Sequence, residues 1–343
     1  FWKKFGEMGY FGLSFPEQYG GSNLDFFYTV IMLEEVSKIF SGGFAITAAV
    51  QVCMSSPYIL HHGSDYLKET FFKAAVAGEK IGCIGITEPG AGSDVANIQT
   101  RAIKDGDYYI VNGSKTFITN GIYGHFVILV CKTNPDAGSA GVSLLVVDLN
   151  SEGISKNKLK KLGWLSSDTA ELHFDNVKVP KENLLPGKSG LGAPMMCLDS
   201  ARYGIAWGAI GAAMDCYDTA LRYSKERIQF GKPIAGFQLQ QKKLAEMITE
   251  ITKAQLLTWR LGVLMNEGRA TPAQISMAKR NNVDLALNVS RNARQMLGGM
   301  GITGEYPIMR HMMNLESVVT YEGTHDIHLL ITGLDITGEN AFA

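Results

Sequence analysis

The sequence has no excess of charge of either sign. Its 343 residues include 32 Lys and Arg against 33 Asp and Glu, which gives a formal net charge of −1. A nucleic-acid-binding protein normally has a basic face or tail, so this balance argues against that class. No uninterrupted apolar run reaches the roughly 18–20 residues that cross a bilayer, so no membrane span is predicted.

Cysteine and histidine are few and show no ligand spacing. The five cysteines are odd in number and contain no Cys-x-x-Cys pair: Cys53, Cys83, Cys131, Cys197 and Cys216. This pattern indicates free thiols in a reducing compartment and excludes a disulfide framework or a zinc site. The seven histidines have no metal-ligand spacing. No metal is therefore predicted.

The start of the chain is also informative. Phe1 is not an initiator Met, and apolar residues already recur at helical spacing from Phe1 to Phe5. We therefore expect a trimmed chain whose leader, if any, the sequence cannot show.

Hydrophobic periodicity divides the chain into three parts. Residues 1–79 show helical spacing and predict an N-terminal α-helical domain. One apolar stripe there consists of Phe26, Val30, Leu33, Val36 and Phe40, and Ser22-Asn23 is the expected helix cap. Residues 80–187 show period two, and residues 188–343 are helical again. The length suits several packed units, and the predicted class is α+β.

The central part, residues 80–187, predicts an antiparallel sheet or barrel. Short alternating runs predict strands, and no helical pattern intervenes. Asp105-Gly106 and Asn112-Gly113 are strong hairpin-turn signals on either side of Tyr108–Val111. We therefore expect a turn at each of these two dipeptides.

The last part predicts a four-helix bundle. Residues 237–267 have apolar side chains at helical spacing, and Gly268 ends the pattern. Thr271-Pro272 then supplies a cap residue and a proline at the first helical position, and the next helix is expected to end near Leu297. Long helices in succession, each with a wide apolar face, are typical of a bundle.

Three segments contain residue types that suit a binding site. Thr87–Asp94 follows an apolar strand and contains Pro89, Gly90 and Gly92, so its backbone could approach a ligand closely or form an ordinary surface turn. Gln295–Gly301 follows a long helix, where Gly298-Gly299 is equally explained as a C-cap. In Thr320–His328, a Glu near a helix start is equally explained by the helix dipole.

Together these segments resemble the acyl-CoA dehydrogenase family over essentially the whole chain. The run Thr-Glu-Pro-Gly-Ala-Gly-Ser-Asp is followed, in the family's order, by Lys115–Asn120, Arg227–Gly231, the Gln-x-x-Gly-Gly-x-Gly run and Tyr321–Thr324. The family fold that this resemblance implies is an N-terminal helical domain, a central antiparallel β domain and a C-terminal four-helix bundle. The helix–β–helix order predicted from periodicity agrees with it.

The resemblance implies an FAD-dependent enzyme that removes two hydrogens from the α and β carbons of an acyl-CoA thioester. Glu322 matches the family's catalytic base, which takes the α-proton while a hydride passes to flavin N5. A carboxylate in a dry pocket has a raised pKa and becomes a usable base. Some relatives have the base at the position of Ala201, which cannot do this work. Glu322 is therefore the expected catalytic residue.

Other roles follow from the same resemblance. The residues that match flavin contacts are Ile84, Ile86, Thr87, Gly92, Ser93, Phe117, Thr119, Arg227, Gln229, Phe230, Phe237, Gln238, Gln295, Gly299, Thr324 and Asp326. Phe117 stands where Trp is commoner, and Asp326 where several relatives have Gln. Seven of them match positions that reach the flavin adenine and pyrophosphate across a subunit boundary: Arg227, Gln229, Phe230, Phe237, Gln238, Gln295 and Gly299. Arg227 is also explained as a surface charge. The residues that match substrate contacts are Ser93, Ser167, Asp199, Arg202 and Gly323, and Asp199 and Arg202 are also explained as a helical ion pair.

The resemblance also implies partners and a setting. It implies a homotetramer built as a dimer of dimers, with an electron-transfer flavoprotein as the electron acceptor. It implies a role in acyl-CoA metabolism such as fatty acid β-oxidation. The expected location is the cytoplasm in a bacterium and the mitochondrial matrix in a eukaryote.

The substrate is predicted from a missing cation. The carboxyl-terminal half is most similar to glutaryl-CoA dehydrogenase, whose pattern has an Arg in the first helical domain that holds the substrate's distal carboxylate. Phe44 occupies that position here, and no Lys or Arg occurs from Ile39 to Leu67. Burying a carboxylate without a partner costs several kcal/mol. We therefore expect a short, branched or cyclic apolar acyl group, with glutaryl-CoA as the alternative.

Two other functions are compatible with the same fold. One is a flavin monooxygenase or oxidase, whose members typically lack the Glu of Tyr-Glu-Gly-Thr. The other is a non-catalytic scaffold. The presence of Glu322 favours the dehydrogenase over both.

Overall fold

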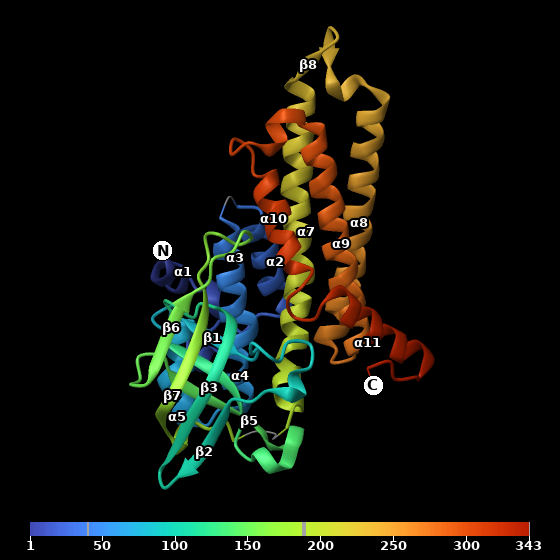
Figure 1. Ribbon diagram of the computed structural model, residues 1–343. Helices are drawn as coiled ribbons and strands as arrows, with labels where there is room; N and C mark the ends of the chain where they lie inside the picture. Colours follow the sequence, from blue (N-terminus) through green and yellow to red (C-terminus); the bar gives the residue numbers. More distant parts are fainter. Residues whose placement is uncertain (40, 187–189, 343) are drawn as a thin grey trace. The chain divides into compact units, whose positions relative to one another are not determined.

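The computed structural model describes residues 1–39, 41–186 and 190–342. Phe40 of the expected apolar stripe and the expected boundary between residues 187 and 188 lie outside them. The chain forms two compact units. Unit 1 consists of Phe1–Thr29, Ile46–Lys161 and Ser166–Ala201, and unit 2 of Val30–Ala45, Leu162–Leu165 and Arg202–Ala343. Each unit is described separately below (Figure 1).

The first part of the chain is helical, as predicted. Its helices are α1 (Trp2–Glu7), α2 (Phe26–Ser37), α3 (Gly42–Ala49), α4 (Ser56–His62), α5 (Asp65–Leu67) and α6 (Lys73–Val76), with π-helical turns at Val50–Ser55 and Lys68–Phe72. The expected cap of α2 at Ser22-Asn23 is wrong. The Asp25 side chain accepts a hydrogen bond from the backbone N–H of Phe27 at 2.8 Å, so the capping residue stands directly before the helix.

A seven-stranded sheet forms the centre of unit 1 (Figure 1). Its strands pair in the order β1-β4-β2-β3-β7-β6, with β5 on β4. The strands are β1 (Gly82–Gly85), β2 (Arg101–Asp105), β3 (Tyr108–Thr119), β4 (Phe126–Lys132), β5 (Val142–Asp148), β6 (Ile154–Lys158) and β7 (Thr169–Pro180). Most pairs are antiparallel, as predicted, but β4 pairs in parallel with both β1 and β2. Strand spacing alone does not show these two pairings because the partners are distant in sequence.

One of the two predicted turns is wrong. Gly106 has φ +59 and joins β2 to β3 in a hairpin, as predicted. Asn112-Gly113 instead lies inside β3, where the register with β7 shifts between Val111 and Gly113. A Cβ on Gly113 would lie 2.5 Å from Thr100 Oγ1. The glycine therefore permits a bulge and a close approach of the backbone, and not a turn.

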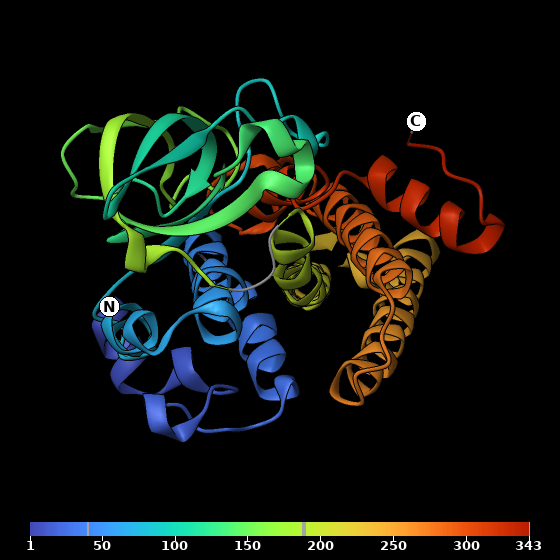
Figure 2. The same ribbon diagram turned by 90° about the horizontal axis from the view of Figure 1, so that it is seen from below.

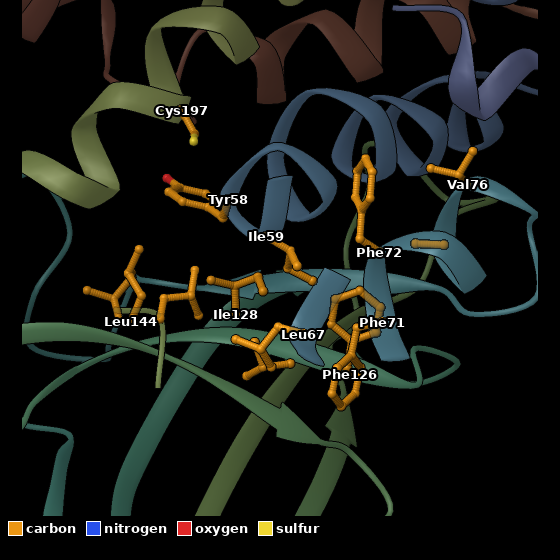
Figure 3. Close-up of a cluster of buried hydrophobic side chains, with 14 of the residues drawn as sticks. Tyr58, Ile59, Leu67, Phe71, Phe72, Val76, Phe126, Ile128, Leu144 and Cys197 are labelled. Carbon is orange, nitrogen blue, oxygen red and sulfur yellow. The ribbon is translucent and has the colours of Figure 1, made fainter. Parts of the chain in front are cut away.

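The helices of unit 1 cover one face of this sheet. Their apolar side chains form a buried cluster with side chains of β4 and β5 (Figure 3). Phe71 packs edge-on against Phe126 at 5.4 Å between ring centroids, and Ile59 and Leu67 are fully buried beside Ile128. A second cluster on the sheet contains Val127, Leu129 and Leu172. Alternate residues of β4 thus enter different clusters, as the two-residue period of a strand requires.

The chain from Gly42 to His62 is long and apolar enough, by length and composition, to cross a membrane. Of its most apolar window, 78% is buried inside the protein. A helix in the core of a protein can have the same length and apolar composition, so burial inside the protein explains the apolar character of this segment.

Unit 2 contains the long helices that the sequence predicts as a bundle, together with Val30–Ala45 and Leu162–Leu165. It contains most of α7 (Gly192–Glu226), then α8 (Gln238–Asn266), α9 (Pro272–Met296), α10 (Ile308–Val318) and α11 (His325–Thr337). Helix α9 packs against α8, α10 and α11, and Figure 2 shows α8 and α9 side by side near their ends. The two-stranded hairpin β8 (Ile228–Gln229) and β9 (Lys232–Pro233) lies between α7 and α8.

Buried polar contacts join the bundle helices. Asn282 of α9 donates to the carbonyl of Ala206 in α7 at 3.1 Å and to the hydroxyl of Thr258 in α8 at 2.6 Å. The predicted start of α9 is confirmed, because Thr271 and Gln274 form a reciprocal capping box. The predicted helix from 237 to 267 matches α8 within one residue at each end.

Candidate active site

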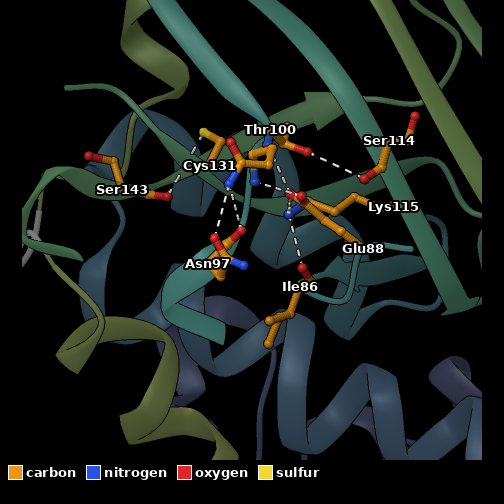
Figure 4. A network of polar contacts seen from close by, with 9 residues as sticks. Ile86, Glu88, Asn97, Thr100, Ser114, Lys115, Cys131 and Ser143 are labelled. Carbon is orange, nitrogen blue, oxygen red and sulfur yellow. Dashed lines mark hydrogen bonds and ion pairs between the residues drawn. The ribbon is translucent and has the colours of Figure 1, made fainter. Parts of the chain in front are cut away.

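In unit 1, the loop after β1 is held by a buried ion pair (Figure 4). Lys115 Nζ lies 2.8 Å from Glu88 Oε1 and also donates to the carbonyl of Ile86 at 2.9 Å. The Glu88 carboxylate accepts the backbone N–H groups of Gln99 and Thr100 at 2.6 and 2.9 Å. Burial would raise the pKa of Glu88, but the Lys115 charge and these hydrogen bonds hold it below its usual value.

Most of the loop's polar groups are thus used to fix its own backbone. Thr116 N–H donates to the carbonyl of Thr87 at 2.9 Å, which ties the loop to β3, and Glu88 and Ala91 exchange two backbone hydrogen bonds. Pro89 and Gly90 thus form an exposed two-residue turn between Glu88 and Ala91, and the buried Glu88 side chain anchors it. An open cavity of about 420 Å³ beside Glu88 is lined by Pro89, Gly90, Asn97, Gln99, Thr100, Gly113 and Ser114.

The flavin contacts predicted in unit 1 lie along β1, this loop and the end of β3. Ile84, Ile86, Thr87 and Thr119 are half-buried, whereas Gly92 and Ser93 are exposed on the loop. Phe117 has φ +59 and is 70% exposed, at a shift in register between Lys115 and Ile118. A left-handed aromatic residue that is open to solvent is costly by itself. A planar ring stacked on Phe117 would offset that cost, so these residues fit a flavin.

The other two substrate contacts predicted in unit 1 are less exposed. Ser167 is 5% exposed and accepts a hydrogen bond from Lys161 Nζ at 2.8 Å. Burial, with a contribution from Lys158, lowers the pKa of Lys161 to about 8, against the opposing effect of Asp168. Asp199 is half-buried on α7.

In unit 2, Glu322 lies in the segment between α10 and α11, in an unusual backbone conformation. Its φ is +53, in the left-handed region that only glycine adopts without cost. Both carboxylate oxygens are buried, and neither has a hydrogen-bond partner among the residues that the structure describes. Its backbone carbonyl accepts a hydrogen bond from Arg202 Nε at 3.0 Å. A strained, desolvated carboxylate without a partner is typical of a functional site.

Burial controls the titration of this carboxyl group. It raises the pKa of Glu322 to about 8, although the positive charges of Arg202 and Lys279 act in the opposite direction. An unpaired charge in a dry site is unfavourable, so the proton is retained to a higher pH than in water.

The structure shows a contact of Arg202 that the sequence analysis did not predict. Its side chain is 8% exposed, and its Nε binds the Glu322 backbone. It therefore supports the segment that contains the carboxylate.

The sequence analysis missed Lys279, a fully buried lysine on α9. Its Nζ donates to the carbonyls of Val318, Tyr321 and Gly323 at 2.8, 3.0 and 2.9 Å. Its burial could have been predicted from its position four residues after Ile275 and four before Val283, on the apolar face of the helix. A lysine at such a position needs buried partners, and these partners flank Glu322.

The residues after Glu322 begin α11. Thr324 caps the helix, since its hydroxyl accepts the backbone N–H of Ile327 at 3.2 Å, and Asp326 is exposed in the first turn. Gly323 has φ +95, and a Cβ there would lie 2.9 Å from the ring of His328. His328 is fully buried, and burial together with Lys279 and Arg202 lowers its pKa to about 3. It therefore stays neutral.

The remaining predicted flavin contacts lie at a different level of the bundle. Arg227, Gln229 and Phe230 are on the β8–β9 hairpin, which is followed by Phe237 and Gln238; Phe230 is 95% exposed. Tyr223, near the end of α7, packs edge-on against Tyr306, which follows the exposed Gln295 and Gly299 segment. Helix α7 is continuous from Arg202 to Glu226, so about 36 Å separate these two levels. The hairpin group and the Glu322 group are therefore distinct within one chain.

Two further observations concern metal ligands and cysteine thiols. Among residues 1–39, 41–186 and 190–342, no group of three or more His, Cys, Asp and Glu side chains is placed to hold a metal ion. All five cysteines are buried free thiols. Burial raises the pKa of the Cys83 and Cys216 thiols well above the usual value. Buried thiols of this kind are inert.

Comparison with known proteins agrees with this geometry. Three domain models match the chain: acyl-CoA dehydrogenase N-terminal domain at residues 1–79, middle domain at 83–177 and C-terminal domain at 188–335. A short-chain specific acyl-CoA dehydrogenase of Megasphaera elsdenii is 38% identical over 333 residues, which are 95% of this chain and 86% of that protein. A glutaryl-CoA dehydrogenase of Desulfococcus multivorans is 37% identical over 339 residues, 97% of this chain and 87% of that protein.

Solved structures give the same result. The crystal structure of a glutaryl-CoA dehydrogenase from Mycobacterium smegmatis in complex with FADH2 has a TM-score of 0.95 and 39% identity, and the match covers 100% of this chain and 87% of that one. The matches extend over both units and include the segments of Glu88, Phe117 and Glu322. The chain belongs to the acyl-CoA dehydrogenase family of FAD-dependent oxidoreductases.

Proposed function

We propose that this enzyme removes the α-proton and a β-hydride from an acyl-CoA thioester and releases the 2-enoyl-CoA, with Glu322 as the base. The observation that supports this most directly is the buried Glu322 carboxylate without a hydrogen-bond partner in the described part of the chain. A carboxylate that was only structural would be paired or exposed, because an unpaired buried charge is costly.

The titration of Glu322 suits this role. A base works best when its pKa lies near the operating pH, and burial raises the pKa of Glu322 to about 8. The group is protonated below that pH and becomes competent as the pH rises through it. We therefore expect kcat/KM to increase with pH over the range near 8.

The backbone at Glu322 offers a second function. Its N–H makes no hydrogen bond to another described residue, so it is available to a thioester oxygen that gains negative charge as the α-proton leaves. Lys279 and Arg202 donate hydrogen bonds to the neighbouring carbonyls. These carbonyls therefore do not compete with the thioester oxygen for the Glu322 N–H. When bound, FAD supplies the hydride acceptor.

Anaerobic titration with an acyl-CoA tests the reaction class. Bleaching of the yellow protein, followed by slow reoxidation in air, is expected for a dehydrogenase. Rapid reoxidation would indicate an oxidase or monooxygenase, and failure to bind flavin would indicate a scaffold. Either of these results would refute the proposal.

We further propose an apolar acyl group that is short, branched or cyclic. The support is the absence of Lys and Arg from Ile39 to Leu67, with Phe44 half-buried on α3. A glutaryl carboxylate would then lose its partner, at a cost of several kcal/mol. Glutaryl-CoA is the second candidate, because the chain is also similar to glutaryl-CoA dehydrogenases.

A substrate panel checks this prediction. We expect kcat/KM to be at least about 100-fold higher for butyryl-, isobutyryl- or cyclohexanecarbonyl-CoA than for glutaryl-CoA, as a lost ion-pair partner of about 3 kcal/mol requires. A preference for glutaryl-CoA would show that a cation elsewhere in the chain holds the distal carboxylate.

We propose a homotetramer in which one copy completes the flavin site of another. The support is the separation of about 36 Å along α7 between Arg202 and the hairpin group, which places the predicted flavin contacts of the hairpin far from the Glu322 segment of the same chain. Phe230 is 95% exposed and packs edge-on against Phe237, at 6.1 Å between ring centroids. An exposed aromatic group of this kind is typical of an interface.

Phe230→Asp tests the shared site. It should weaken association at least about tenfold and lower flavin retention in parallel, because a charge replaces an aromatic side chain that the proposed interface buries. Light scattering gives the assembly size, and visible absorbance gives the flavin content. Tyr66→Asp, at an exposed aromatic residue of unit 1, should change neither. An unchanged assembly in Phe230→Asp would refute the shared site.

By the same resemblance, we propose an electron-transfer flavoprotein as the electron acceptor. The proposed compartment is the cytoplasm of a bacterium or the mitochondrial matrix of a eukaryote.

A further inference from the structure

Two cations hold the backbone around Glu322, and neither is hydrogen-bonded to its carboxylate. Lys279 binds the carbonyls of Val318, Tyr321 and Gly323, and Arg202 binds that of Glu322 itself. The carboxylate oxygens remain without a partner among the described residues. The positive charges therefore act on the carboxylate through space.

The contacts of Lys279 require the charged ammonium group. It has three N–H donors, and three carbonyls receive them at 2.8–3.0 Å. A neutral amine has only two donors, so one buried carbonyl would lose its partner. Desolvation, with a contribution from Arg202, lowers the pKa of Lys279 to about 8 against the opposing charge of Glu322. The three hydrogen bonds favour the charged form.

The same contacts constrain Glu322. Tyr321 and Gly323 flank it directly, and both of their carbonyls point to one ammonium group. Lys279 thus fixes the peptide unit before Glu322 and the one after Gly323, while Arg202 binds the carbonyl of the unit between Glu322 and Gly323. These contacts hold the backbone of a residue whose φ of +53 is unfavourable by itself. A strained conformation persists only when its surroundings determine it, and Lys279 supplies that constraint from α9.

We propose that Lys279 is a positioning residue for Glu322: it clamps the Tyr321 and Gly323 carbonyls so that Glu322 keeps its left-handed conformation, and it places a positive charge near the carboxylate that favours the proton-accepting form. This inference rests on the proposed role of Glu322 as the base.

The other titratable groups near Glu322 come from three elements. Arg202 approaches from α7, His325 and His328 belong to α11, and Tyr321 is adjacent in sequence. His328 is neutral, and burial raises the pKa of Tyr321 well above its usual value. Lys279 and Arg202 are therefore the charges that favour the ionised carboxylate, and only Lys279 binds both flanking carbonyls.

Lys279→Gln in the flavin-loaded enzyme is the first test. The amide can still donate to two carbonyls, but the positive charge is lost. The protonated carboxyl band of Glu322, identified by its loss in Glu322→Gln, is followed by infrared difference spectroscopy as a function of pH. Loss of a nearby opposite charge should shift the midpoint upward by about one pH unit or more. Turnover should fall about tenfold or more at pH 7, mainly in kcat.

Two further variants separate charge from packing. Lys279→Arg keeps the charge and should restore the carboxyl midpoint to within about half a pH unit of the original. Lys253→Gln removes an exposed lysine of α8 that pairs with Glu250 and should leave the midpoint unchanged, because solvent screens that charge. If Lys279→Gln does not fold, the midpoint of the Glu322 carboxyl titration in Lys279→Arg still tests the charge effect. An upward shift in that variant would refute it.

The outcomes distinguish this inference from the proposed function. An unchanged midpoint in folded Lys279→Gln would overturn the role of Lys279, even if the enzyme is a dehydrogenase. A shifted midpoint in a protein that does not bleach with any acyl-CoA would refute the proposed function while confirming that Lys279 favours the ionised Glu322.

Discussion

Glu322→Gln should lower turnover by about 10²–10⁴-fold or more while the protein remains yellow. The amide has nearly the shape of the carboxyl group but cannot accept the α-proton. The buried carboxylate oxygens have no hydrogen-bond partner in the described residues, so the exchange breaks no contact there. Steady-state assays at pH 8, with the visible spectrum of the purified protein, measure both quantities.

A matched control lies on α10. Glu316 is 54% exposed on its side chain and forms an ion pair with Arg291. Glu316→Gln also removes one carboxylate of unit 2, and it should leave turnover and flavin content unchanged. Turnover within a few-fold of the original in Glu322→Gln would remove this residue from the role of base. Loss of the yellow colour would show that its role is in binding the cofactor.

Lys115→Met should destabilise the protein by about 3–5 kcal/mol, because it leaves Glu88 buried without its counter-ion. Lys115 is fully buried and Glu88 is 7% exposed, so water cannot replace the lost partner. The change also removes the hydrogen bond to Ile86 in the loop that is expected to contact the flavin. Urea-induced unfolding, followed by circular dichroism, measures the loss of stability.

The pH dependence provides an internal check of the same pair. Lys115 holds the pKa of Glu88 below its ordinary value of 4.5 in the folded state. The pair therefore contributes its stability above about pH 4.5, and the contribution is lost as the pH falls through the folded-state pKa. Lys115→Met should consequently lose stability at pH 7 and differ less from the original protein in acid.

An exposed ion pair of the same unit serves as the control. Lys181 lies 2.6 Å from Asp107, and both side chains are largely exposed. Lys181→Met should cost less than about 1 kcal/mol, because water replaces the lost partner. Equal losses for Lys115→Met and Lys181→Met would show that burial does not determine the contribution of the Glu88–Lys115 pair.

Features that depend on neighbouring residues were predictable from the sequence. The cap at Thr271, the helix that follows it and the turn at Gly106 were all predicted, and each involves groups within a few positions of one another. The order of helical and strand periodicity determined the fold class. The motif order pointed to the family and to Glu322 without any knowledge of distances.

Features that depend on residues far apart in sequence required the structure. Asn112-Gly113 has the composition of a turn but lies in a bulge of β3, because pairing with β7 extends the strand through it. Glu88 and Lys115 are 27 positions apart, and no periodicity joins them. The parallel pairing of β4 with β1 and β2 is likewise absent from any local pattern.

The sequence by itself determined which residue is the candidate base, and the tertiary structure decided what that residue can do. A glutamate has an ordinary pKa in water, and only the burial of Glu322 raises it towards neutrality. Lys279 lies 39 to 44 positions from the carbonyls that it binds, so chain folding alone brings them together. Desolvation and the placement of charge are properties of the packed chain, and for this reason the chemistry of the site could not be predicted from residue types alone.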